Sequence, residues 1–437
     1  MSSPRFPRWA IVLLGLFALA ALLLVGSCAY LSRDEPPPDV SDLQLVYRDD
    51  IPDDQNAYAL LTALAVKVPN PFTELDDEAN ERLEAIQRGE AWDAELVAHL
   101  LEDTEHLWPA LEQALAAPDS QAPQLNSFAD VIPEVGQLRQ LSELACLRAR
   151  QLAYHGSPDK AVRLLVATVT LGQRMQHSQS SLITWLTGAF IKTMASECLT
   201  QVATNTHLDD TTTTFAISAL EHLRPSAGAL TDTFKAEFHV SSTELANFAK
   251  KPAEEMAKLA DNAEHPLPVR LTGWLPLAFK ENKTRRIYAD HLREVISLVD
   301  TDNQQLRDTH LGENIRIKIK PSANPNNAIG RVFLGIVIPT FGKIISVRHH
   351  EQSRLSATQA YLAVRAYQQN HDGELPPTLD ALVPDYLPAV PLDHYDREPI
   401  RYSREFRAIW SLGRDGEHTV TSADQPVEKG EVDLRLP

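Results

Sequence analysis

The sequence predicts a mainly α fold, in which a membrane-anchored multi-helix bundle or short helical array is followed by a small α+β domain with a long helix and a short antiparallel sheet. Three features of the 437 residues predict it. The chain begins with a long apolar run, and apolar residues then recur at helical spacing through the next part. Prolines break up the last part, where short runs have the pattern of strands. We therefore expect an N-terminal anchor or signal (1–31), a linker (32–52), a helical domain (53–300) and an α+β domain (301–437).

The first 31 residues indicate attachment to a membrane. Arg5 and Arg8 precede an unbroken apolar run, AIVLLGLFALAALLLV, at residues 10–25. With the uncharged residues that follow, this run is about as long as one membrane-spanning helix. Positive charge on the short N-terminal side keeps that end in the cytoplasm. We therefore expect a single-pass inner-membrane protein that contacts the membrane through residues 9–31 and has its body in the periplasm.

A second interpretation of the same segment is a lipoprotein signal. Val25-Gly26-Ser27-Cys28 resembles a bacterial lipobox, in which the cysteine is lipidated and becomes the mature N-terminus. Cys28 would then make this a lipid-anchored envelope protein. Under both interpretations, the proline-rich stretch at residues 35–39 is a short stiff spacer between the membrane and the folded body.

Composition limits the partners and the disulfides. A formal net charge of -18 offers no basic footprint for a phosphate backbone, so we expect no nucleic-acid partner. Three cysteines are too few for a disulfide framework. Cys146 and Cys198 lie in apolar helical segments, where a buried free thiol is the simpler interpretation. A bridge between these two in an oxidising envelope is the alternative.

Successive amphipathic helices are predicted in the body. The clearest hairpin turns at His155-Gly156-Ser157, and Pro158 suits the first turn of the following helix. This hairpin loosely resembles one tetratricopeptide-type unit, but no second copy follows at that family's period, so an irregular bundle is favoured over a repeat array. Lys192 and Glu197 interrupt the apolar run at 182–199, which is therefore not a second membrane span.

Near residue 300 the pattern changes. IRIKIK at 315–320 alternates strictly and predicts a strand with one buried and one solvated face. A long helix is predicted over residues 340–370, with a short helix at 378–383 and two antiparallel strands at 399–402 and 407–412. The long helix has a narrow packing stripe formed by Leu355, Thr358, Gln359, Leu362 and Ala366.

In the C-terminal hundred residues, several features follow one another in a fixed order. They are a proline-tipped apolar segment (336–339), the long helix, a turn at 373–376, the leucine-rich half-turn at 378–383 and the loop Leu412-Gly413-Arg414-Asp415-Gly416. In this order they resemble the globular domain of the major pseudopilin of type II secretion. The resemblance implies the fold of the C-terminal domain. The order of anchor, helical body and pseudopilin-like tail also resembles that of a class of bacterial envelope proteins.

The resemblance further implies a calcium site. In that family the terminal loop holds calcium through a backbone carbonyl and carboxylates. The ligands here would be the carbonyl of Leu412 and the side chains of Asp415 and Asp424, and calcium would be the cofactor. Calcium takes six or more oxygen ligands, which a flexible loop can supply. From the residues alone, the alternative is that Asp415-Gly416 forms only a tight turn.

Motifs of catalysis and cofactor binding are missing from the sequence. It contains no phosphate-binding loop, dinucleotide glycine pattern, nucleophile elbow or HExxH zinc motif. The nearest cluster of metal-ligand type is His349-His350-Glu351, which we interpret as a solvated helix face because adjacent side chains diverge by about 100° on a helix. Asp393 and Asp396 lie in a proline-rich loop, where aspartates more often cap turns than catalyse. We predict no catalytic or cofactor-binding residues.

We therefore expect a non-enzymatic envelope protein whose helical body binds or scaffolds other envelope proteins. Two alternatives stay open. One is an accessory component of a type II secretion or pilus-like system, acting through the C-terminal domain. The other is an envelope hydrolase with an unrecognised site. A charged or apolar groove between helices favours a binding role, whereas a deep pocket with two or more carboxylates or histidines within hydrogen-bond reach favours a hydrolase.

Overall fold

The computed structural model describes residues 33–48, 50–130, 132–251, 278–302, 305–306, 326–337, 341–425 and 431–437. The expected anchor with Cys28 and the expected strand at 315–320 lie outside the described residues. Within the described part of the chain, no helix is long and apolar enough to cross a membrane. The fold is mainly helical with a small three-stranded antiparallel sheet, as the sequence predicts.

The chain forms two compact units. Among the described residues, the first contains 33–43, 241–251, 278–293 and 326–337. The second contains 44–48, 50–130, 132–240, 294–302, 305–306, 341–425 and 431–437. This division differs from the expected boundary near residue 300. The physical reason is that residues 341–437 share one hydrophobic core with long helices of the body.

Most of the helices belong to the second unit. Its first part contains short elements, which are η2 (Asp53–Gln55), α2 (Ala57–Ala65), η3 (Pro71–Glu74), α3 (Asp77–Arg88), α4 (Ala94–Leu100) and α5 (Leu107–Leu115). Long helices follow, namely α6 (Pro133–Tyr154), α7 (Pro158–Gln176), α8 (Leu182–Asn205) and α9 (Asp210–His222). α10 (Ala227–Lys250) begins in this unit and continues into the first.

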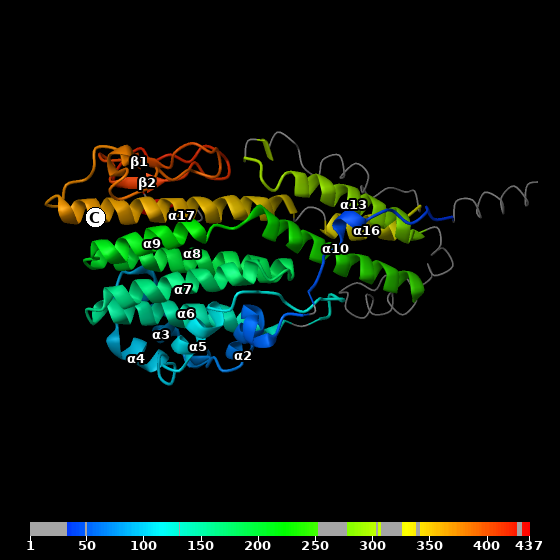
Figure 1. Ribbon diagram of the computed structural model, residues 1–437, viewed down its shortest axis with the longest axis horizontal. Coiled ribbons are helices and arrows are strands. Elements are labelled where there is room, and N and C mark those ends of the chain that lie inside the picture. The colour runs from blue at the N-terminus through cyan, green and yellow to red at the C-terminus, as the bar shows by residue number, and fades with distance from the viewer. Residues whose placement is uncertain are drawn as a thin grey trace, which may run out of the picture. The chain divides into compact units, whose positions relative to one another are not determined.

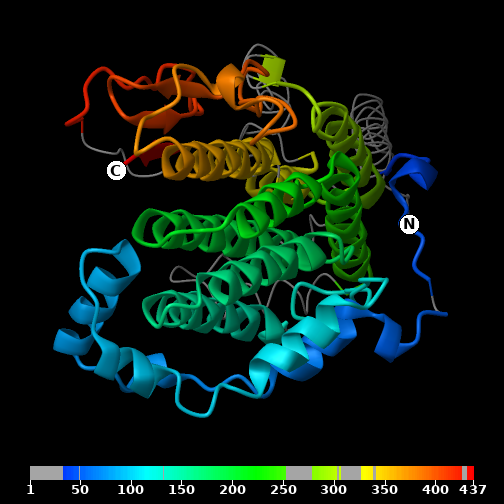
Figure 2. The ribbon, with the colours of Figure 1, turned by 60° about the vertical axis from the view of Figure 1, so that its left-hand side comes forward.

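Local signals explain where these helices begin and end. Gly156 has φ 77°, the left-handed conformation that ends α6, and Pro158 occupies the first turn of α7. Asp209 caps α9, because its side chain accepts a hydrogen bond from the N–H of Thr212. The predicted hairpin is therefore present, with α6 and α7 packed against each other and against α8 (Figures 1 and 2).

α7 and α8 cross unusually closely at two glycines. A Cβ atom built on Gly172 would lie 2.5 Å from the carbonyl oxygen of Gly188, and one built on Gly188 would lie 2.6 Å from the carbonyl oxygen of Gly172. No side chain fits at either position without a shift of backbone. This crossing sets how near the two helices approach.

α17 (Phe341–Asn370) is the longest described helix, and it confirms the predicted helix at 340–370. It packs along α8 and α9 on one side and against the sheet on another (Figure 1). Twenty-two of its thirty residues are buried. Such a helix is enclosed on nearly all sides, not only along the predicted stripe.

The small sheet follows α17 and the short helix η6 (Leu379–Leu382), which lies within the predicted half-turn. Its strands are β1 (Arg401–Ser403), β2 (Ala408–Trp410) and β3 (Asp433–Arg435), paired antiparallel in the order β1-β2-β3. β1 overlaps the predicted strand at 399–402 and extends one residue beyond it, and β2 lies within the predicted strand at 407–412, whereas β3 was not predicted. Ile409 of β2 is opposite Leu434 of β3, and Ile409 is wholly buried in the shared core.

The first unit includes η1 (Ser41–Leu43), much of α13 (Glu281–Ser297), and α16 (Ala328–Val337). The segment expected to be a short stiff spacer packs against α13. Arg286 forms an ion pair with Glu35 at 3.0 Å, and Arg293 forms one with Asp42 at 2.8 Å. Residues 33–43 are therefore part of the folded unit, because their acidic groups meet basic groups of that helix.

Cys146 on α6 and Cys198 on α8 are both buried free thiols. The Cys198 thiol donates to the backbone carbonyl of Cys146 at 3.5 Å. The simpler of the two interpretations from the sequence, a buried free thiol at each position, describes this structure.

Candidate functional site

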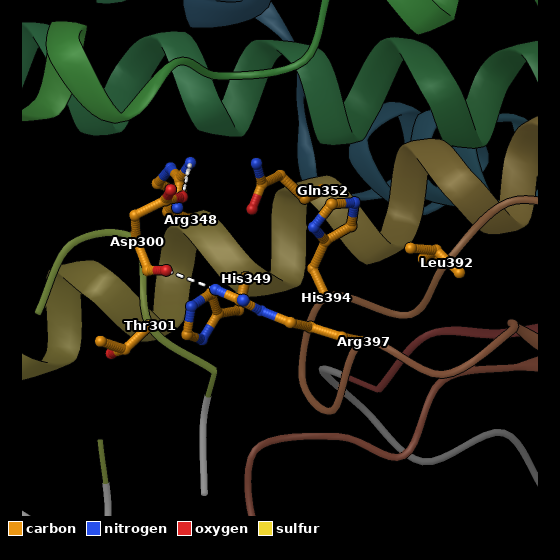
Figure 3. A pocket seen from close by; sticks show the side chains of 8 residues that line it. All are labelled: Asp300, Thr301, Arg348, His349, Gln352, Leu392, His394 and Arg397. Carbon is orange, nitrogen blue, oxygen red and sulfur yellow. Dashed lines mark hydrogen bonds and ion pairs between the residues drawn. The ribbon is translucent and has the colours of Figure 1, made fainter. Parts of the chain in front are cut away.

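The strongest candidate site is a cavity of about 250 Å³ beside the N-terminal half of α17 (Figure 3). Three segments of the second unit line it: turns of α17, the residues that follow α13, and the proline-rich loop after η6. The lining residues are Asp300, Thr301, Arg348, His349, Gln352, Leu392, His394 and Arg397. We call this cavity the Arg–His pocket.

Arg348 and Arg397 bring positive charge to the Arg–His pocket. Arg348 is almost wholly buried; its Nη1 donates to the carbonyl of Val299 at 2.8 Å, and its Nη2 lies 3.3 Å from Oδ1 of Asp300. Burial lowers the pKa of the Arg348 guanidinium, and the charge of Asp300 opposes that shift. Arg397 is exposed and donates to the backbone carbonyl of Asp300. Two guanidinium groups thus meet at one short acidic segment (Figure 3).

Both histidines of the Arg–His pocket are neutral at pH 7. Burial lowers the pKa of His349 to about 4, with the charge of Arg348 as the next cause. Burial likewise lowers the pKa of His394 to about 3, with the charge of Arg224 as the next cause. Nη1 of Arg224 lies 2.9 Å from Nε2 of His394. Because a guanidinium only donates, Nε2 accepts and the imidazole proton is on Nδ1.

A buried carboxylate fixes the loop that carries two of the pocket residues. Asp393 is fully buried and accepts hydrogen bonds from the hydroxyls of Ser353 and Ser411, each at 2.8 Å. It also accepts from the N–H of Leu412 at 2.7 Å and forms an ion pair with Arg401. It closes a turn as well, by accepting the N–H two residues on, as expected for an aspartate in this loop. This one side chain therefore ties the loop to α17 and to the end of β2.

A second buried pair joins α17 to α8. Nζ of Lys192 lies 2.5 Å from Oε1 of Glu351, and the two side chains are 0% and 1% exposed. Lys192 also donates to Gln173 at 2.6 Å and to Gln176 at 3.1 Å, and Gln176 donates to Glu351 at 2.7 Å. Burial lowers the pKa of the Lys192 ammonium, and Glu351 opposes that shift. The four side chains form one connected, buried polar cluster.

The interpretation of His349-His350-Glu351 as a solvated helix face is wrong. His349 and Glu351 are 2% and 1% exposed. Glu351 faces Lys192 on α8, whereas His349 lines the Arg–His pocket. The reason is that α17 is covered on several sides, which its own sequence does not reveal. Within the described residues, no group of three or more His, Cys, Asp or Glu side chains is arranged to hold a metal ion.

The structure places the predicted calcium ligands in two turns. The carbonyl of Leu412 accepts a hydrogen bond from the N–H of His418 at 3.0 Å, and Oδ1 of Asp415 accepts one from the N–H of Glu417 at 3.0 Å. Asp424 is exposed in a later turn. The Asp415 turn agrees with the alternative drawn from the residues, and the calcium site stays a prediction.

A larger cavity of about 480 Å³ lies at the far end of α6 and α8, next to the end of α3. Its most distinctive feature is an aromatic pair, in which Trp92 stacks on Tyr154 with ring centroids 5.0 Å apart. Arg150 and Gln201 line its polar side and are hydrogen-bonded to each other. Nε1 of Trp92 is buried and has no hydrogen-bond partner among the described residues. This cavity is mainly aromatic, whereas the Arg–His pocket gathers charge.

The residues of the Arg–His pocket were not predicted as a site. A signal was present: Arg348, His349 and His350 are consecutive on a helix that also carries an apolar packing stripe, which is an unusual density of basic groups for a buried helix. What could not be found from sequence is that Asp300 and Arg397 meet them. Comparison of the chain with models of protein families, with curated proteins and with solved structures finds no match.

Proposed function

We propose that this chain is a non-enzymatic, membrane-anchored envelope protein that binds a partner through the Arg–His pocket. The observation that carries the proposal is the convergence of Arg348, Arg397 and two neutral histidines on one open cavity. Guanidinium groups and neutral imidazoles are recognition groups that donate hydrogen bonds to a ligand. The charged groove between segments is the feature expected of a binding protein.

The chemistry of the pocket supports binding over hydrolysis. A hydrolase needs a base that can take a proton from water or from a nucleophile. Nε2 of His394 already accepts from Arg224, and the pKa values of His349 and His394, about 4 and about 3, make both imidazoles weak bases at neutral pH. The pocket therefore favours holding a ligand over transforming one.

Site-specific photo-crosslinking in intact envelopes tests the binding role. A photoreactive phenylalanine analogue replaces Leu392, which is 45% exposed at the pocket, and in a matched control it replaces Phe128, which is 57% exposed elsewhere in the same unit. We expect a discrete crosslinked species from position 392 that is absent from position 128. Equal crosslinking at both positions, or none at either, would contradict the proposal.

The membrane anchor is tested separately at the N-terminus. Mass spectrometry of the protein from a membrane fraction, with and without Cys28→Ser, distinguishes the two kinds of attachment. An intact Met1 terminus supports the helical anchor, and an acylated cysteine terminus supports the lipoprotein. A reporter fused after Pro38 should be active only on the periplasmic side; activity in the cytoplasm would refute the envelope assignment.

The order of long helix, short helix and antiparallel sheet favours a second candidate, an accessory component of a type II secretion or pilus-like system. The test uses the full chain, because residues 341–437 share their core with α6, α7, α8 and α9 and would expose it in isolation. Co-purification with components of such a system from envelopes would support this role. If no such component is found in the species crosslinked at position 392, this second candidate is refuted.

A further inference from the structure

We propose that the Arg–His pocket binds a carboxylate, held between the guanidinium groups of Arg348 and Arg397. This inference rests on the proposed binding role of the same pocket and names the chemistry of its ligand. Guanidinium is the side chain whose planar fork of donors best matches a carboxylate.

The first support is the gathering of positive charge in an acidic chain. The formal net charge of the protein is -18, yet Arg348 lowers the pKa of both His349 and His394. Arg397 acts in the same direction on His349, and Arg224 does so on His394. Like charges that converge on a cavity repel each other, and an anion bound between them relieves that repulsion. The only carboxylate among the lining residues is that of Asp300, which is 79% exposed and touches the pocket from its edge.

The second support is a donor whose capacity is unused. Nε of Arg348 is buried and lacks a hydrogen-bond partner among the described residues, although this side chain lines the cavity. Buried polar atoms are normally paired, so such an atom at a cavity indicates a missing partner. A small adjustment of this side chain would turn the unused donor toward an oxyanion.

The third support is that the pocket already accommodates a carboxylate. Oδ1 of Asp300 lies 3.3 Å from Nη2 of Arg348. This distance is longer than the roughly 2.7–2.9 Å that is typical of a charge-assisted hydrogen bond. A ligand carboxylate that enters the cavity can approach Arg348 more closely than the carboxylate of Asp300 does. Asp300 is therefore a weak internal competitor for the ligand.

The cavity volume limits the size of the group that enters. About 250 Å³ holds a short chain end but not a folded element. Leu392 at the rim offers apolar surface beside the charged groups. The ligand that fits is a small carboxylate or the carboxyl end of a peptide.

Calorimetric titration of the full chain in detergent tests the inference with defined probes. The probes are the tripeptide Ala-Ala-Ala with a free carboxylate, the same peptide with an amidated C-terminus, and inorganic phosphate. We expect the free peptide to bind and its amide to bind at least tenfold more weakly, because only the former carries the anion. Binding of phosphate alone, or equal binding of the peptide and its amide, would overturn the assignment of a carboxylate.

Three variants locate the binding. Arg397→Gln should lower the affinity for the free peptide at least tenfold, because it removes an exposed guanidinium with little effect on the core. Asp300→Asn should raise the affinity for the free peptide several-fold, because it removes the carboxylate that competes for Arg348. Arg404→Gln is the matched control, since Arg404 is a surface arginine of the same unit with only a 3.9 Å ion pair, and it should leave binding unchanged.

The outcomes separate this inference from the proposed function. A discrete crosslink from position 392 without any binding of the free peptide would refute a carboxylate ligand but would support the proposed binding role. Binding of the free peptide without a crosslink in envelopes would support a carboxylate ligand and would refute the proposal that the pocket binds a protein partner in the envelope. An affinity that Arg397→Gln and Asp300→Asn leave unchanged would place the ligand elsewhere and overturn the inference.

Discussion

The two halves of α17 are buried to a similar degree, yet different side chains hold them. Toward its C-terminal end, Ala360, Leu362, Ala363 and Val364 are apolar and lie in the core shared with α8 and α9. Toward its N-terminal end, the buried residues between Ser346 and Arg354 are all charged or polar, and several of them meet a specific partner. Apolar packing tolerates many neighbours, whereas a buried charge needs one particular partner. The polar half of this helix therefore depends on distant residues far more than the apolar half does.

The partners of the polar half come from several elements. Glu351 pairs with Lys192, Arg354 pairs with Glu197 at 3.1 Å, and Ser353 donates a hydrogen bond to Asp393 at 2.8 Å. The Arg–His pocket opens beside this half. The comparison suggests a division of roles, in which the apolar half anchors α17 and the polar half positions binding groups.

Breaking the buried ion pair should have the largest effect on stability. Lys192→Met leaves the carboxylate of Glu351 buried without its cation, and we expect a loss of about 3–5 kcal/mol in the free energy of unfolding. Chemical denaturation of the variant measures it. Lys160→Met, at an exposed lysine on α7, is the control and should change stability by less than about 0.5 kcal/mol.

The double variant Lys192→Met with Glu351→Met sharpens this result. It removes both charges, so much of the loss should be recovered. A double variant that is as unstable as the sum of its two single variants would show that pairing does not hold the polar half together.

In the apolar half, Leu362→Ala should cost about 3 kcal/mol, because it removes a fully buried side chain and leaves a cavity. Denaturation of this variant at low and at high salt provides the contrast. Its loss should not depend on salt or on pH. A loss below about 1 kcal/mol would mean that the helix is less tightly packed there than the structure indicates.

The glycine crossing should give a smaller effect. Gly188→Ala places a Cβ atom against the backbone of α7 and near the side chain of Gln176, at 2.9 Å from its Cγ. We expect a loss of about 2 kcal/mol as α7 and α8 separate. Gly136→Ala is the matched control, since a Cβ atom there meets nothing within 4 Å and should be neutral or stabilising.

The smallest expected effect is the pH dependence of stability that comes from His349 in the polar half of α17. The pKa of His349 in the folded protein, about 4, is below the usual value of 6.5, so the unfolded chain takes up the proton first as the pH falls. Stability is therefore lost between about pH 6.5 and pH 4. From pH 6.5 to pH 5.5, His349 alone should lower the free energy of unfolding by about 1 kcal/mol.

Denaturation curves at these two pH values, for the wild-type protein and for His349→Gln, measure that contribution. The variant should lose about 1 kcal/mol less than the wild type over the same interval. An identical loss in both proteins would show that His349 titrates normally and is not buried as described.

Periodicity predicted the fold where the apolar residues determine it. The helix expected at 340–370 spans Phe341–Asn370, and the turn at Gly156 separates α6 from α7 as expected. β3 was missed because Asp433–Arg435 is three residues long and shows no alternation. Its strand conformation depends on pairing with β2, which is a contact between distant parts of the chain.

The candidate site could not be predicted for the same reason. Arg348 and His349 have the composition of a solvated helix surface, and only the packing of other segments over them makes them a pocket. Asp300 and Arg397 are ordinary loop residues in the sequence, and their meeting with α17 depends on the tertiary fold. The bonds of Asp393 show this most clearly, since its partners lie on α17 and at the end of β2.

Hydrogen–deuterium exchange of the full chain, with and without saturating Ala-Ala-Ala, tests most directly whether the polar half of α17 forms a binding site while the apolar half is structural. We expect slower exchange in residues 298–302 and 391–397 when the peptide is present, and no change in residues 360–366. Unchanged exchange in both pocket segments, or an equal change in the two halves of the helix, would contradict it.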